Sequence, residues 1–170
     1  MAAERVSACG LGTVSVRSDA DLDADILVVA KADHVTEQQL ACAEKAANYY
    51  DVELTSSLQP RFEALREARM AAVMVSRARD WLRKHDLLDR LPDYRPGLTD
   101  DAAFARKIET LCDAQGALES ADGPRLLNTQ WAMQHMTPPD MKTGPMECLF
   151  NATAAAGFDV GFIGNRPNTP

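Results

Sequence analysis

A cysteine, a histidine and an aspartate occur near one another in the C-terminal part of the sequence, and these are the residue types of a nucleophilic centre. Cys148 falls in the first turn of a helix that we predict to begin at Pro145, where the helix dipole favours a thiolate. His135 and Asp140 precede it and could supply a base and an orienting group. No signature of a known cysteine enzyme surrounds Cys148, so a buried or disulfide-bonded cysteine is the competing interpretation.

The sequence contains four widely spaced cysteines, Cys9, Cys42, Cys112 and Cys148. They form no Cys-x-x-Cys pair, so nothing supports a zinc knuckle or a thioredoxin-type motif. Two disulfides in an exported protein and four thiols in a cytosolic one both fit. If the cysteines are bridged, we expect Cys9–Cys42 and Cys112–Cys148, because each pair joins neighbouring elements. The start Met1–Arg5 has no signal-peptide pattern but resembles a trimmed one, which slightly favours a periplasmic or secreted location over the cytoplasm.

Metal and cofactor sites have no support in the sequence. The only histidines, His34, His85 and His135, are too far apart to form a His-x-x-x-His or Glu-x-x-His pair. Alternating aspartates in Ser18–Asp25 lack the glycine and glutamate that a calcium loop requires. The glycines of Cys9–Gly12 do not lead from a strand into a helix, as a phosphate loop would. We therefore expect no metal and no cofactor.

Charge and hydropathy restrict the partners. With 18 Lys and Arg against 25 Asp and Glu, the net charge is −7, which disfavours nucleic acid. Apolar stretches are too short for membrane insertion. The segment Arg61–Lys84 is locally basic, and Arg66, Arg69 and Arg77 share one helical side. These arginines indicate either a solvated helix face or a binding surface for an acidic partner.

Hydrophobic periodicity predicts an α+β fold in one domain over residues 1–166, followed by a flexible tail at 167–170. We expect a sheet of about three strands, near residues 11–17, 25–30 and 158–163, packed against a layer of four to five helices. The helices are predicted from Glu37 after a Thr36–Gln39 capping box, from Pro60 to about His85, from Thr99 to Gly116, from 126 to 136, and from Pro145 to Gly157.

These observations favour a non-enzymatic binding or protein-interaction domain, exported from a bacterial cell, with an unknown protein or small molecule as partner. The alternative is a small cysteine-dependent enzyme that uses Cys148 and His135. A third hypothesis is an assembly protein that uses the basic helix Arg61–Lys84. A reactive thiol at Cys148 distinguishes the enzyme from the other two.

Overall fold

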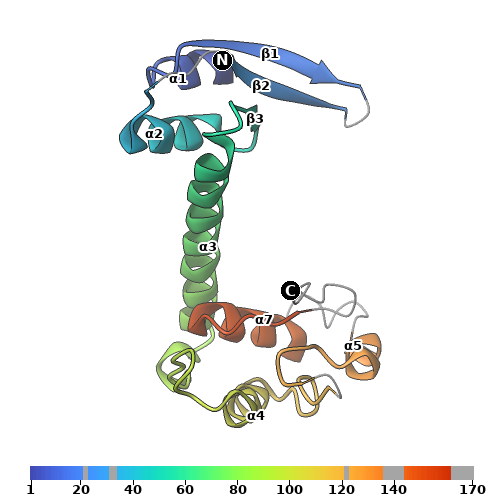
Figure 1. Cartoon of the computed structure of the whole chain (residues 1–170). Coiled ribbons are helices and arrows are strands. Elements are labelled where there is room, and N and C mark those ends of the chain that lie inside the picture. The colour runs from blue at the N-terminus through green and yellow to red at the C-terminus, as the bar shows by residue number, and fades with distance from the viewer. Residues whose placement is uncertain (21–22, 31–33, 121–122, 136–143, 162–170) are drawn as a thin grey trace. The chain divides into compact units, whose positions relative to one another are not determined.

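The computed structural model describes residues 1–20, 23–30, 34–120, 123–135 and 144–161. The chain divides into two compact units, Met1–Ala71 and Ala72–Pro170, here called the N-terminal unit and the C-terminal unit. The division falls inside helix α3 (Gln59–Lys84), so each unit contains one part of that helix (Figure 1). The single domain over residues 1–166 stays a prediction, and the tail at 167–170 lies outside the described residues.

The predicted α+β fold with a small three-stranded sheet is confirmed. The described residues form six α-helices and one sheet, with the strand order β1-β2-β3 (Figure 1). Strands β1 (Thr13–Asp19) and β2 (Ala24–Ala30) form the expected antiparallel hairpin. Strand β3 (Asp51–Glu53) pairs with β2 in parallel, so the whole sheet belongs to the N-terminal unit.

The third strand is not where the sequence indicated. We expected it at residues 158–163, but strand β3 is Asp51–Glu53, and Gly161 makes only an isolated bridge. Phe158 is buried in the C-terminal unit, where its ring centroid lies 5.0 Å from that of Phe104. Burial of this large ring in an aromatic cluster outweighs the strand-like alternation of the segment. Residues 162–163 lie outside the described part of the chain.

Two short helices cover the sheet in the N-terminal unit. Helix α1 (Ala2–Ser7), which the sequence analysis did not predict, packs against helix α2 (Glu37–Ala47). A disulfide links Cys9, in the turn that follows α1, to Cys42 in α2, with 5.7 Å between their Cα atoms. The large, fully buried side chains of this core are Val6, Leu11, Leu27, Leu40 and Phe62.

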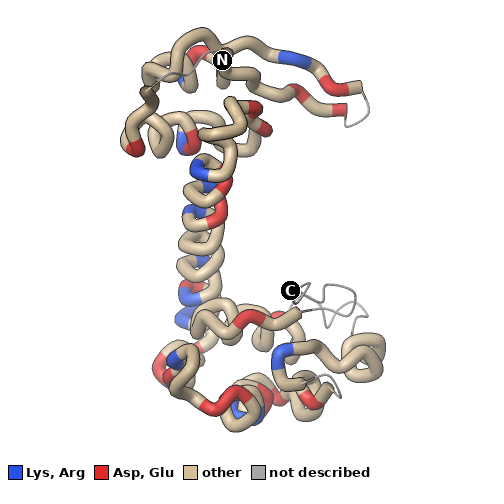
Figure 2. Tube along the Cα trace, in the orientation of Figure 1, with Lys and Arg blue, Asp and Glu red and all other residues tan. Residues whose placement is uncertain are grey.

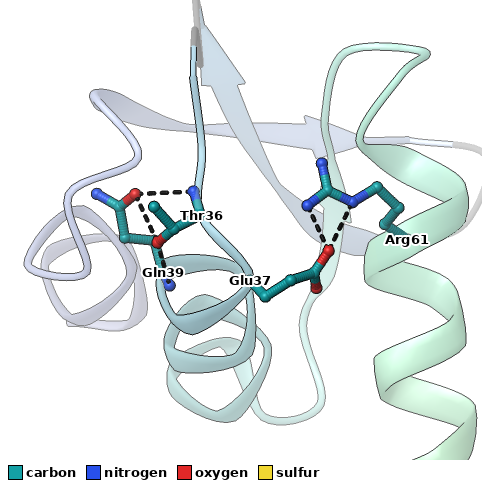
Figure 3. Close-up of polar contacts among 4 residues, drawn as sticks. All are labelled: Thr36, Glu37, Gln39 and Arg61. Atoms are coloured by element: carbon teal, nitrogen blue, oxygen red, sulfur yellow. Dashed lines mark hydrogen bonds and ion pairs between the residues drawn. The ribbon is translucent and has the colours of Figure 1, made fainter.

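The predicted capping box starts helix α2 (Figure 3). The Gln39 N–H donates to Thr36 Oγ1 over 3.2 Å, and the Thr36 N–H donates to Gln39 Oε1 over 3.0 Å. In the same first turn of α2, Glu37 Oε1 accepts a hydrogen bond from Arg61 Nε over 2.9 Å, which links α2 to α3 (Figure 3). The side-chain amide of Gln39 also donates from Nε2 to the Gly10 carbonyl. A Cβ atom added at Gly10 would lie only 2.8 Å from this Nε2. Gly10 also has φ of 80°, a backbone conformation that favours glycine at this position beside the cap.

The C-terminal unit is built from helices α4 (Asp101–Cys112), α5 (Thr129–His135) and α7 (Pro145–Ala156), with a 3₁₀ turn at Leu88–Arg90. Helix α7 begins with a proline and ends at a left-handed Gly157, as expected. A disulfide between Cys112 and Cys148 links α4 to α7, with 5.4 Å between their Cα atoms. The large, fully buried side chains of this core are Leu82, Phe104, Ile108, Leu118, Leu149 and Phe158.

One polar cluster fastens the loop before α5 to the start of α4. Arg125 Nε donates to Asp101 Oδ2 over 2.7 Å, and the Tyr94 hydroxyl donates to Asp101 Oδ1 over 2.9 Å. The Arg125 guanidinium also lies 4.9 Å from the centroid of the Phe158 ring. Hydrogen bonds from Arg125 and then from Tyr94 hold the pKa of Asp101 below its usual range.

This cluster predicts a sensitivity to acid. A lowered folded-state pKa means that ionised Asp101 stabilises the fold above the usual pKa of an aspartate, and that this contribution is lost as the pH falls through the folded value. We expect Asp101→Asn to remove part of the decline in unfolding free energy below about pH 4, measured by urea denaturation at stepped pH. Burial raises the pKa of Glu109, so the protonation of Glu109 changes the unfolding free energy in the opposite direction. This contribution is the same in the wild type and in Asp101→Asn. Parallel pH curves for the two proteins would contradict the assignment.

The disulfide of the N-terminal unit gives a test of the single domain. The double variant Cys9→Ala, Cys42→Ala opens a loop of sequence separation 33 and should lower the unfolding free energy by about 3–4 kcal/mol. If residues 1–166 unfold as one domain, calorimetry will show one transition and the variant will shift all of it. Two transitions, of which only one moves, would show that the units unfold separately.

Candidate functional site

The proposed nucleophile Cys148 has no free thiol in this structure. It is buried and bonded to Cys112, and the described residues contain no free cysteine. His135 is held by its own helix, because its Nδ1 lies 2.8 Å from the Trp131 carbonyl oxygen and its ring stacks on the indole at 4.1 Å between centroids. Asp140 lies outside the described residues. With Cys148 bonded to Cys112, a cysteine nucleophile would require reduction of this disulfide, and the enzyme that uses Cys148 and His135 stays a prediction.

An open pocket of about 350 Å³ in the C-terminal unit is lined in part by Cys112 and Cys148, the two cysteines of the disulfide. Three chain segments meet there: the end of α3, the end of α4 and the start of α7. This volume is within the range of small-ligand sites. The pocket is lined by Trp81, His85, Leu87, Leu111, Cys112, Asp113, Gly144, Pro145 and Cys148.

An aromatic pair forms one wall of this pocket. Trp81 and His85 are four residues apart, and their rings stack with 4.0 Å between centroids and 25° between planes. Trp81 Nε1 donates to Glu147 Oε1 over 2.9 Å, which fixes the indole. Glu147 Oε2 is buried and has no hydrogen-bond partner in the described part of the chain. The orientation of the Trp81 ring is thus set by Glu147 of α7.

The rim of the pocket carries an exposed carboxylate, Asp113. This residue ends helix α4 in the left-handed conformation, with φ of 53°. The expected helix end was Gly116, three residues further on, so Asp113 takes the position in which glycine is more common. Aromatic rings, leucine side chains and one carboxylate suit a flat apolar group that bears a hydrogen-bond donor or a positive charge.

Sequence reasoning did not identify Trp81 and His85 as a site. The spacing of four residues between Trp81 and His85, which places both rings on one side of a helix, was the available signal. Among the described residues, no group of three or more His, Cys, Asp or Glu side chains could hold a metal ion. The residues described here also include no helix with the length and hydropathy to cross a membrane.

Two of the three arginines predicted to bind an acidic partner make contacts inside the N-terminal unit. Arg69 Nε donates to both carboxylate oxygens of Glu44, at 2.7 and 2.8 Å, and the Glu44 side chain is 4% exposed. Arg66 donates to Asp51 over 3.2 Å. Arg77 is exposed and has no hydrogen bond or ion pair to the residues that the structure describes. Figure 2 shows that basic and acidic residues are interleaved along α3. Binding by all three arginines stays a prediction.

Comparison of the chain with known protein families, with curated proteins and with solved structures gives no match. The assignment of function therefore rests on the residues and their geometry.

The arginines of α3 give a matched pair of variants. Arg69→Ala should lower the unfolding free energy by about 2–4 kcal/mol, because it leaves the buried Glu44 carboxylate without its partner. Arg77→Ala removes the same side chain from an exposed position and should change stability by less than about 0.5 kcal/mol. Chemical denaturation of both variants provides the measurement. An equal decrease in unfolding free energy in Arg69→Ala and Arg77→Ala would contradict a stabilising role of the Arg69–Glu44 pair.

Proposed function

We propose that this chain is a non-enzymatic binding protein of an oxidising compartment, and that the pocket beside Cys112–Cys148 is its ligand site. The single observation that carries the proposal is the stacked Trp81–His85 wall, which is fixed by Glu147 and faces a pocket of ligand size. Export from a bacterial cell, which the sequence analysis favoured, is retained as part of the proposal.

The disulfides support the proposed compartment. Both of the cysteine pairs are bridged, and disulfides persist in secreted, periplasmic and other oxidising environments. The two cysteines that line the pocket are bonded to each other, so neither offers a thiolate nucleophile. Binding therefore fits these residues better than cysteine chemistry does.

The pocket also supports a class of ligand. A flat ring can pack against Trp81 and the leucines, and a cationic substituent can approach Asp113 at the rim. An anionic substituent at the same place would meet a like charge. The proposal is therefore an aromatic or similarly flat ligand group with a positively charged substituent.

Three probes with the same ring test this proposal: tryptamine, indole and indole-3-acetate. We expect the dissociation constants, measured by ligand-observed NMR on the oxidised chain, to increase in that order, with tryptamine at least about fivefold tighter than indole-3-acetate. Trp81→Ala should weaken all three probes. Asp113→Asn, at an exposed rim position, should remove the preference for tryptamine.

Leu98→Ala is the control, because Leu98 is 82% exposed in the same unit and does not line the pocket. It should bind all three probes as the wild type does. No binding of any probe to the wild type would overturn the proposal. Equal affinities in the wild type, Asp113→Asn and Leu98→Ala would overturn the role of Asp113 in particular.

A further inference from the structure

A short turn of the N-terminal unit presents two tyrosines to solvent. Tyr49 and Tyr50 lie between helix α2 and strand β3, and they are 78% and 42% exposed. Tyrosine side chains on a fixed backbone are frequent anchors in protein interfaces, because a large ring is immobilised at a small cost in conformational entropy. The turn is therefore a candidate contact surface, distinct from the pocket of the other unit.

The backbone of this turn is held at several points. Asn48 ends α2 with φ of 56°, and the Tyr50 N–H donates to the Ala47 carbonyl over 3.1 Å. Arg66 Nη2 donates to the Tyr50 carbonyl over 2.6 Å, and Arg66 Nη1 donates to Asp51. Strand β3 then pairs with β2 from Asp51 onward. The two rings are thus carried on a fixed backbone and do not need to be ordered by a partner.

A hollow of about 240 Å³ lies beside the rings. It is lined by Ala24 and Asp25 at the start of β2, and by Tyr49, Tyr50 and Asp51. The hollow has room for one long side chain, and it combines two aromatic rings with two carboxylates. That combination suits a guanidinium or ammonium group, through cation–π contact and ion pairing.

The charge of the unit favours the same partner. Residues 1–71 contain 12 Asp and Glu against seven Lys and Arg, so they carry −5 of the total charge of −7. Arg17 is engaged with Glu53, and Arg66 already shares Asp51 over 3.2 Å. Asp25 accepts a hydrogen bond from Ser18 and has no ion pair in the described part of the chain, so it provides the uncompensated charge of the hollow. A basic partner is attracted to this unit, whereas an acidic one is repelled.

We propose that the turn Asn48–Tyr50 and its hollow dock a basic segment of a partner protein, with a Lys or Arg side chain entering between Asp25 and Asp51. The stem of that side chain packs on the tyrosine rings, and its charged end meets the carboxylates. This interaction goes beyond the proposed ligand site, and its test uses none of the pocket residues.

The experiment titrates the full oxidised chain, labelled with ¹⁵N, with acetylated tetra-arginine amide and records backbone amide shifts. We expect the shifts to concentrate at Ala24, Asp25 and residues 49–51. Two variants, Tyr49→Ser and Asp25→Asn, should each weaken binding about tenfold. Tetra-glutamate of the same length should not bind.

Matched controls separate docking from a general effect of negative charge. Glu67→Gln removes one exposed charge from the same unit, and Val16→Ser removes an apolar side chain that is 53% exposed. Both should bind the peptide within about twofold of the wild type. Equal weakening by Asp25→Asn and Glu67→Gln, or full affinity in Tyr49→Ser, would overturn the proposal. Binding of a neutral oligosaccharide at the same amides, without binding of the peptide, would also overturn it.

Discussion

The two disulfides are the constraint on which the rest of the structure depends. Cys9–Cys42 joins the turn after α1 to α2, and Cys112–Cys148 joins α4 to α7, with sequence separations of 33 and 36. Each bond lies within one unit, and each removes about 3–4 kcal/mol of chain entropy from the unfolded ensemble. Small units with cores of modest size commonly need such bonds. The C-terminal bond also forms part of the wall of the pocket, so the proposed ligand site depends on the same sulfur atoms that stabilise the unit.

Ion pairs connect helix α3 to α2 and β3 in the N-terminal unit. Three arginines of α3, Arg61, Arg66 and Arg69, pair with acidic residues of α2 and β3. The Arg69–Glu44 pair is the most protected from water, because its carboxylate is buried. Each of these pairs cancels one positive and one negative charge, so the unit keeps its net charge of −5.

Much of the fold could be predicted where the signal was local. Alternation identified the hairpin, the Thr36–Gln39 spacing identified the start of α2, and proximity in the chain identified the preferred cysteine pairs. Strand β3 has only three residues, too few for a periodic signal, and it forms through a parallel pairing with β2. The pocket also could not be predicted from the sequence, because the three chain segments that line it come together only in the folded protein. Helical periodicity placed Arg66 and Arg69 on one side of α3 but could not show that this side meets Asp51 and Glu44.

The most direct test of this account is disulfide mapping of the unreduced protein by tryptic digestion and mass spectrometry. Trypsin separates the four cysteines into the peptides 6–17, 32–45, 108–125 and 143–170. We expect two linked species, 6–17 with 32–45 and 108–125 with 143–170, and no free thiol. A link between a peptide of the first pair and one of the second, or free cysteines at 112 and 148 in protein from its native host, would contradict it.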